Sequence, residues 1–449
     1  MQYLLTLTLG LLSIQVSASS RPNDLALTVA DIGKYNCEQE CQKNLRQGME
    51  KDREVFKGAP FDYDFYATAD NFTTSSPGDV LKLQPYYLSH LDIPASVSAY
   101  KMQYVSLGLQ GEKVPVTGFI AIPFTSDAHG GKARLVALAH GTIGAVQSCA
   151  PSSSYNLYDY DTWIPLLVAG YAVVATDYAG MGNNYTTTKY INPVSNGEDT
   201  YWSVVAARRA FPDTFTRRWA TLGHSQGGGT VWAVAENPRV RGPESGEYIG
   251  GVASAPGPRV YDMLAEHAKA GELNAQHPAG KYVPLFAKAI QSVNPSSQKV
   301  DFLSDAGQKR EGLLEELQLC LQGSAAVNAD LPQAGLKSAS AVVESKQLKA
   351  LQDDYGAALG KKKQFRDLLV VQGTGDQTEG CNVTIKAYKT ACNAGNIVHL
   401  SLYPGLDHRP VLIASTPEWM AWFDKKFRGA PDWERCEIRT LEPLVIGKP

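Results

Sequence analysis

The chain has 449 residues, of which 44% are hydrophobic and 19% are charged, a composition that fits a globular protein and excludes disordered and fibrous classes. The formal net charge of −3 provides no positive field for nucleic acid, and the longest basic run is the triplet 361–363. We therefore expect no nucleic-acid partner.

The N-terminus predicts export from the cell. An apolar stretch from Tyr3 to Val16 precedes Ser17 and Ala18, a small-residue pattern that signal peptidase cleaves. A membrane anchor is the alternative, but the stretch is too short to span a bilayer and has no positive flank. No other segment reaches the roughly 20 apolar residues of a spanning helix. We predict a signal peptide over residues 1–18 and a secreted, extracellular protein without a transmembrane segment.

Secretion would place the seven cysteines in an oxidising compartment, where disulfides persist. An odd number leaves at least one cysteine unpaired, and the sequence does not fix the pairing. The pair Cys37 and Cys41 has no second pair or histidine cluster nearby, so we predict no metal site. Asn71, Asn184 and Asn382 each begin an Asn-x-Thr sequence and are glycosylation acceptors if the host is eukaryotic.

The first part of the mature chain, residues 19–95, is rich in Asp, Ser, Pro and Tyr and has weak periodicity, which indicates an irregular wrap over the core. Two β-rich runs, 102–109 and 116–122, then predict a hairpin at a sheet edge. Short apolar runs follow at 135–139, 171–175, 219–222, 248–253, 368–371 and 397–402, with helical patterns at 201–211 and 230–236. Strands that are apolar on both faces and separated by helices are typical of a mostly parallel sheet flanked by helices. We predict an α/β core over 96–257 and 364–449.

The interval 258–363 is too long for a simple crossover between strands. It contains no convincing strand, but leucines at 313, 314, 317 and 321 recur at helical spacing, and residues 285–293 repeat the pattern. We predict a helical cap over the carboxyl ends of the strands, where it would set substrate size. A packing domain away from the site is the alternative.

The motif that organises the chain is the Gly-x-Ser-x-Gly sequence Gly223-His224-Ser225-Gln226-Gly227. Between a buried strand and a helix, such a motif makes a sharp turn that exposes the serine Oγ and aims the helix N-terminus at it. Both flanks have the required pattern. With 40 glycines in the chain the motif alone is weak, so the remaining groups must decide.

A serine hydroxyl becomes nucleophilic when a histidine accepts its proton and a carboxylate orients that histidine. Of the four histidines after Ser225, His267 and His277 fall in the predicted cap, and His399 falls in a strand pattern. His408 follows the last core strand on a glycine turn, where a catalytic histidine belongs.

The acid should follow the preceding strand, which selects Asp376, with Glu379 as a fallback. Asp407 is adjacent to His408 and cannot face its ring. Asp177 precedes the serine and is interpreted as a structural residue that anchors its loop.

The negative oxygen of an acyl-transfer intermediate needs two backbone N–H donors. We predict Gln226, directly after the serine, and Thr142, in the loop after the 135–139 strand, as this oxyanion hole. His140 in the same loop is interpreted as structural.

Five motifs, HGTIGAVQSCAPSSS (140–154), GYAVVATDYAGMG (170–182), GHSQGGG (223–229), QGTGD (372–376) and YPGLDHRPVL (403–412), together resemble the secretory lipase family over about residues 60–425. The resemblance implies an α/β-hydrolase fold with a helical lid, ester substrates, no cofactor, and Ser225, Asp376 and His408 as the triad. A disulfide between Cys149 and Cys320, which would link the oxyanion loop to the cap, has a counterpart in that family. Gln-Thr-Glu-Gly-Cys follows Asp376 where the family usually has Val-Pro.

These features predict a secreted serine hydrolase, a lipase or carboxylesterase, that cleaves carboxylic esters through an acyl-enzyme intermediate. Its substrate would be a small-molecule or lipid ester, the latter met at a lipid–water interface. The same triad would also serve an acyltransferase or a peptidase, and a non-catalytic binding protein is the alternative from a different class.

Overall fold

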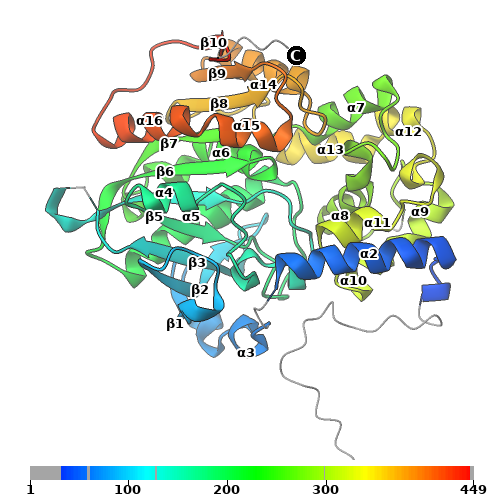
Figure 1. Cartoon of the computed structure of the whole chain (residues 1–449), viewed down its shortest axis with the longest axis horizontal. Coiled ribbons are helices and arrows are strands. Elements are labelled where there is room, and N and C mark those ends of the chain that lie inside the picture. Colours follow the sequence, from blue (N-terminus) through cyan, green and yellow to red (C-terminus); the bar gives the residue numbers. More distant parts are fainter. Residues whose placement is uncertain (1–31, 58–60, 127–128, 298, 445–449) are drawn as a thin grey trace, which may run out of the picture.

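The computed structural model describes residues 32–57, 61–126, 129–297 and 299–444. The predicted signal peptide therefore lies outside the described residues. Within them the chain forms one ten-stranded sheet of order β1-β2-β3-β5-β4-β6-β7-β8-β9-β10 (Figure 1). The strands are β1 (Val80–Pro85), β2 (Val97–Leu107), β3 (Lys113–Pro123), β4 (Ala133–Ala139), β5 (Tyr171–Thr176), β6 (Phe215–His224), β7 (Glu247–Ser254), β8 (Leu368–Gly373), β9 (Val398–Tyr403) and β10 (Glu437–Thr440).

The sheet has an antiparallel edge and a parallel body. Strand β1 pairs with β2, β2 with β3 and β3 with β5, all antiparallel. The β2–β3 pair confirms the predicted hairpin. Every pair from β5 across to β10 is parallel. The α/β fold class is thereby confirmed. The sequence analysis did not foresee β1 and β10, whose residues carry weak apolar patterns at the two sheet edges.

Helices cover both faces of the parallel part of the sheet because its strands are apolar on both faces. Along β4, Leu135 and Ala137 belong to one buried cluster, while Val136 and Leu138 belong to a second cluster on the opposite face. Helices α5 (Pro193–Ala210), α6 (Gln226–Ala235) and α14 (Cys381–Asn393) contribute to the first cluster, and α4 (Ile164–Val168) and α16 (Thr416–Phe427) contribute to the second. The carboxyl ends of the parallel strands therefore stay open for other residues.

The described part of the segment 258–363, called the cap below, consists of helices joined by turns and loops and contains no strand, although two isolated bridges involve its residues. Its helices are α7 (Val260–Ala270), α8 (Val283–Val293), α9 (Asp305–Arg310), α10 (Gly312–Glu316), α11 (Leu321–Ala326), α12 (Ala339–Glu344) and α13 (Lys346–Tyr355), and they gather on one side of the sheet (Figure 1). They enclose a hydrophobic cluster of their own, which includes Leu285, Phe286, Ile290, Leu313, Leu314 and Leu317. The amphipathic patterns of the sequence thus build the interior of the cap.

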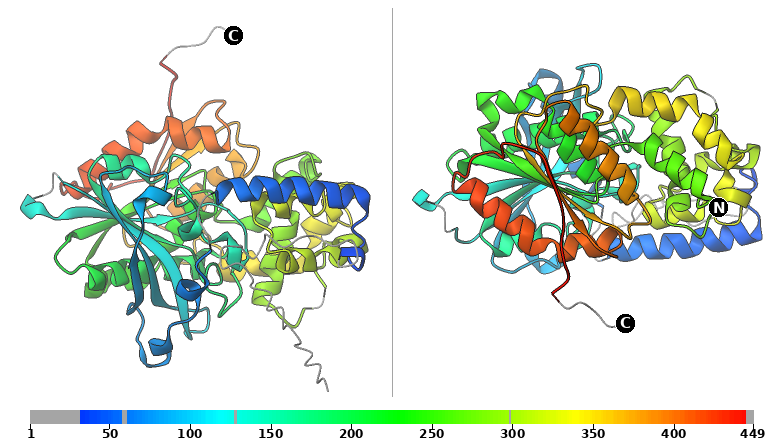
Figure 2. Two further views of the ribbon diagram at one scale, coloured as in Figure 1. Left: turned by 60° about the horizontal axis from the view of Figure 1, so that its bottom comes forward. Right: turned by 90° about the horizontal axis from the view of Figure 1, so that it is seen from above.

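The N-terminal helix α2 (Gln39–Val55) packs along the cap (Figures 1 and 2). Its buried residues Cys41, Leu45 and Met49 join the hydrophobic cluster of the cap. Near its end, the Asp52 carboxylate accepts hydrogen bonds from the N–H groups of Cys320, Gln322 and Gly323 at distances of 3.0, 2.8 and 2.9 Å. Part of the segment predicted to wrap the core therefore covers the cap, and a buried acid fixes its position at the start of α11.

Three disulfides cross-link the chain: Cys37–Cys41, Cys149–Cys320 and Cys392–Cys436. Cys381 remains a free thiol, as the odd count requires. The bridge between Cys149 and Cys320 closes a sequence separation of 171 residues and joins the loop after β4 to the start of α11. It therefore attaches the core loop to the cap at the same place where Asp52 attaches α2.

Replacing Cys149 and Cys320 together by serine should lower the free energy of unfolding by about 2–5 kcal/mol, because the open chain gains unfolded-state entropy. Thermal or denaturant unfolding of the double variant measures this loss. Cys381→Ser is the matched control and should change stability little. A midpoint for the double variant equal to that of the control would contradict the expected stabilisation.

Candidate active site

Ser225 occupies a strained turn between β6 and α6. Its φ and ψ are 59° and −124°, a conformation that non-glycine residues rarely adopt. The surrounding backbone is too crowded for other residues: a Cβ on Gly223 would lie 2.2 Å from the Gly227 carbonyl oxygen, and one on Gly227 would lie 1.9 Å from that of Ala139. The Ser225 N–H donates to the carbonyl of Ser254 on β7 at 3.0 Å, which holds the turn in place. The sequence motif thus forms the expected strand-turn-helix.

Asp376 and His408 face each other from neighbouring strand ends. Asp376 lies just beyond β8, and His408 begins α15 (His408–Ala414), which follows β9. The His408 Nδ1 atom lies 2.9 Å from Asp376 Oδ2. Asp376 also accepts hydrogen bonds from the Gln372 amide at 2.9 Å and from the N–H groups of Thr378 and Glu379 at 2.8 and 3.0 Å. These contacts fix the carboxylate, and through it the histidine ring.

The charges of this pair support each other. Burial opposes ionisation of Asp376, but His408 and the backbone N–H groups outweigh it and lower the Asp376 pKa to about 2. Burial would also lower the pKa of His408, yet the charge and hydrogen bond of Asp376, with smaller contributions from Glu379 and Asp407, raise it above its usual value. The pair is therefore arranged to stabilise a protonated imidazole.

Ser225 and His408 both line a cavity of about 500 Å³ at the carboxyl ends of the strands. Glu379, the fallback acid, is buried next to these residues but has a different neighbour: its carboxyl lies near the Ser225 side chain, whereas Asp376 contacts the histidine. Burial raises the Glu379 pKa to about 8. The structure thus brings a serine, a histidine and two carboxyl groups together, with different partners for the two acids.

The two predicted oxyanion donors are neighbours. Gln226 is the first residue of α6, so its N–H has no hydrogen-bond acceptor within the helix. Thr142 lines the cavity, and its hydroxyl donates to the Gln226 side-chain oxygen at 3.3 Å. The Thr142 carbonyl accepts a hydrogen bond from Tyr158 at 2.6 Å, and the Gly141 N–H donates to the Tyr160 hydroxyl at 3.1 Å. Two tyrosines of one loop therefore hold the segment that contains Thr142, the second predicted donor.

His140 and Asp177 have the structural roles expected of them. His140 is buried and contacts the carbonyls of Gly141 and Asp177 at 2.7 and 3.2 Å. Asp177 accepts hydrogen bonds from the N–H and the hydroxyl of Ser152 at 2.8 and 2.5 Å and from the Thr117 hydroxyl at 2.7 Å. Asp177 thus anchors the loop that continues toward the tyrosines beside Thr142.

His224 is a site residue that the sequence analysis passed over. Its Nε2 donates to the His408 carbonyl at 3.1 Å, and the centroids of the two rings lie 4.5 Å apart. Burial, with the adjacent charge of His408, lowers the His224 pKa to about 3, so the ring is neutral at physiological pH. His224 therefore supports the start of α15, and its position inside the Gly-x-Ser-x-Gly motif was the available signal.

The wall of the cavity does not contain the apolar faces of the cap helices. None of the six apolar cap residues at 285, 286, 290, 313, 314 and 317 is among the described residues that line it. Its apolar surface comes instead from Val55 and Phe56 at the end of α2, from Tyr158 and Tyr282, and from Leu321 at the start of α11. The cap reaches the site through its edges while its apolar faces pack on one another.

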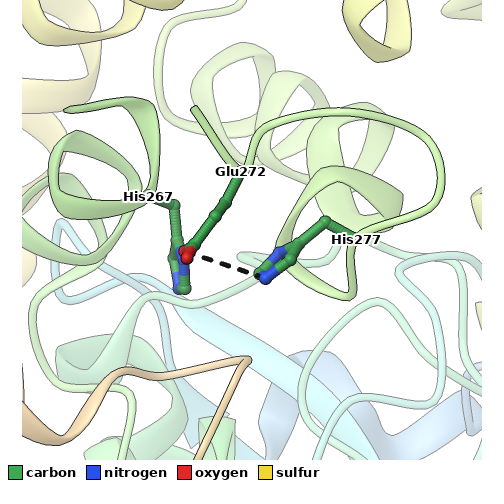
Figure 3. Close-up of side chains that lie close together, drawn as sticks. All are labelled: His267, Glu272 and His277. Carbon is green, nitrogen blue, oxygen red and sulfur yellow. Dashed lines mark hydrogen bonds and ion pairs between the residues drawn. The ribbon is translucent and has the colours of Figure 1, made fainter. Parts of the chain in front are cut away.

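A second histidine cluster links the cap to the loop of Asp376. His267, Glu272 and His277 converge beside α7, with their ligand-type atoms within 4.8 Å of one another (Figure 3). The ring nitrogens of His267 contact Glu272 Oε2 at 2.7 Å and the Thr378 carbonyl at 3.0 Å, and His277 Nδ1 accepts from the Ala279 N–H at 3.3 Å. These contacts form a hydrogen-bond network that joins α7 to the loop after Asp376.

The predicted glycosylation acceptors Asn71, Asn184 and Asn382 are all exposed. In the part of the chain that the structure describes, no helix is long and apolar enough to cross a membrane.

The sequence profile of the Alpha/beta hydrolase family matches residues 136–421. The chain belongs to the alpha/beta hydrolase family. This match spans the predicted triad and oxyanion residues, from Thr142 to His408. No curated protein matches the chain.

Solved structures resemble the chain in fold. Candida antarctica lipase A in its closed state is 16% identical with a TM-score of 0.66, over 84% of this chain and 89% of that one. The rice cell wall degrading esterase LipA from Xanthomonas oryzae is 16% identical with a TM-score of 0.62, over 78% of this chain and 100% of that one. A putative hydrolase from Legionella pneumophila is 16% identical, also at 0.62, over 78% and 99%. At this identity the likeness establishes the fold, and substrate and mechanism have to be argued from the site.

Asp376→Asn should reduce kcat/KM for an ester by about 10⁴-fold, because the amide holds the wrong tautomer of His408. Glu379→Gln should cost far less at pH 7, because that carboxyl does not contact the histidine Nδ1. Steady-state kinetics of the two purified variants measure the difference. An active Asp376→Asn variant beside an inactive Glu379→Gln variant would reverse the assignment of the acid.

Proposed function

We propose that the chain is a secreted carboxylic ester hydrolase that works through an acyl-enzyme on Ser225. The observation that carries the proposal is the 2.9 Å contact of Asp376 with His408, in the same cavity where the strained turn exposes Ser225. Nucleophile, base and orienting acid follow the chain order of α/β hydrolases. A purely binding role would leave this arrangement without a purpose.

In the proposed reaction, Ser225 Oγ attacks the ester carbonyl while His408 Nε2 accepts its proton. Asp376 holds the Nδ1–H and stabilises the imidazolium that forms. The N–H groups of Gln226 and Thr142 donate to the negative oxygen of the tetrahedral intermediate. The intermediate collapses as His408 gives its proton to the leaving alcohol, and water then releases the acid by the same steps in reverse.

The apolar wall of the cavity favours binding of the acyl chain of the substrate. A volume of about 500 Å³ is that of a small-molecule site, and its apolar wall includes Val55, Phe56 and Leu321. Each CH₂ group that leaves water for this wall contributes about 0.8 kcal/mol. We therefore place chain-length selectivity on the end of α2 and the start of α11.

Export is part of the proposal. The sequence at residues 1–18 has the pattern of a signal peptide, and three disulfides are typical of an oxidising compartment. Three exposed Asn-x-Thr asparagines would accept glycans during export from a eukaryotic cell.

The test is hydrolysis of p-nitrophenyl esters from acetate to palmitate by the purified chain, beside an aminoacyl amide and an alcohol acceptor. We expect ester hydrolysis, with Ser225→Ala at least about 10⁴-fold slower in kcat and equally stable to heat. More than a tenth of the parent activity in a clean Ser225→Ala preparation would contradict the mechanism. Faster turnover of the amide, or faster transfer to the alcohol than to water, would instead assign a peptidase or an acyltransferase.

Trimming the cavity wall should change chain-length preference without changing the chemistry. Val55→Ala and Leu321→Ala each remove apolar contacts, so the ratio of kcat/KM for long-chain to short-chain esters should fall several-fold. Val343→Ala, which trims a half-buried cap residue away from the cavity, is the control. An unchanged ratio in the two wall variants would place the acyl chain elsewhere.

A further inference from the structure

Glu379 is a buried acid that the proposed reaction leaves unused. Only 4% of its surface is exposed, although it lies at the open end of the sheet. Its carboxyl oxygens approach the backbone of Gly257 so closely that a Cβ there would lie 2.5 Å from Oε1. The Gly257 N–H in turn donates to the Ser225 carbonyl at 3.0 Å. Burial raises the pKa of the Glu379 carboxyl, and the Ser225 side chain is near enough to lower it in part. Glu379 is therefore enclosed between the nucleophile and the backbone of Gly257.

The groups around this carboxyl come from every element packed against it. His408 and Asp376 are its charged neighbours, from the start of α15 and from the loop after β8. Tyr190, before α5, and Tyr282, in the cap, are close enough that its charge raises the pKa of both hydroxyls. Burial and Asp376 raise the Glu379 pKa and His408 lowers it, and Asp376 already pairs with the His408 ring.

We propose, on the basis of the proposed ester hydrolase, that Glu379 is a protonation switch on the nucleophile. As a neutral carboxylic acid, it leaves the Ser225 hydroxyl free to pass its proton to His408. When Glu379 releases its proton to solvent, the carboxylate accepts the hydrogen of the Ser225 hydroxyl and holds it away from the histidine. The same carboxylate places a negative charge beside the oxygen that becomes negative in the tetrahedral intermediate, which raises its energy.

The direction of the pH response follows from the two titrations. His408 must be neutral to accept a proton, so activity rises as the pH increases through its raised pKa. Burial lifts the Glu379 pKa to about 8, so this group is neutral below that pH and charged above it. Because the two groups interact, the apparent values belong to the pair rather than to either residue. The enzyme should have a bell-shaped profile whose alkaline side depends on Glu379.

The experiment compares the pH profile of kcat/KM for a short ester between the parent chain and Glu379→Gln. The amide has the same shape but cannot ionise. At pH 9, one unit above the Glu379 pKa, kcat/KM of the parent should be about tenfold below its maximum. The variant should keep its maximal kcat/KM at this pH. The acid side of the variant profile should stay close to that of the parent, because Glu379 is already neutral in the acid range.

The matched control is Glu266→Gln, a carboxyl on α7 that binds Asn382 and does not contact the serine. It should keep the alkaline decline of the parent. Thermal unfolding of all three proteins at pH 7 and pH 9, together with the rate at which a fluorophosphonate labels Ser225, separates loss of fold from loss of nucleophile. Equal alkaline declines in the parent and Glu379→Gln would overturn the switch. Absence of both hydrolysis and Ser225 labelling in the parent would overturn the proposed function itself.

Discussion

The structure depends on one strained turn, because the positive φ of Ser225 can persist only where the surrounding backbone enforces it. The backbone approaches so closely at Gly223 and Gly227 that no side chain fits, and β4, β6, β7 and α6 all take part in the contacts. A parallel sheet supplies this crowding since its strands end at one edge. The same edge receives Asp376 and His408 from strands distant in sequence. The strain at the serine and the convergence of its partners thus have a single origin.

Much of the site was predictable because its signals are local. The Gly-x-Ser-x-Gly motif, the apolar run before Asp376 and the glycine turn before His408 each identify a strand end, and the order of the elements then brings the strand ends together. The sheet was predictable for the same reason, since β4 and β5 are apolar on both faces. The edge strands β1 and β10 were missed because exposed or partly exposed edge strands carry weak apolar patterns.

The cap shows where sequence patterns fail. Its leucines indicated helices correctly, but an apolar helix face has the same appearance whether it packs on a neighbouring helix or lines a substrate cavity. In the structure these faces pack together, and α2, from a segment without convincing periodicity, provides part of the wall. Asp52 fixes α2 through three N–H groups and the disulfide of Cys320 fixes the adjoining α11, so long-range contacts that no local pattern reveals determine the shape of the cavity. Glu379 was recognised as a nearby acid, yet only its contact with Ser225 distinguishes it from Asp376.

The most direct test of this account is a crystal structure of the chain after reaction with a long-chain alkyl phosphonate. We expect phosphorus bonded to Ser225 Oγ and a phosphoryl oxygen about 2.7–3.1 Å from the N–H groups of Gln226 and Thr142. His408 should contact the serine oxygen, and the alkyl chain should lie against the end of α2. Phosphonate bonded to a different residue, or a phosphoryl oxygen remote from both N–H groups, would contradict the central claim that this strand edge is an acyl-transfer site.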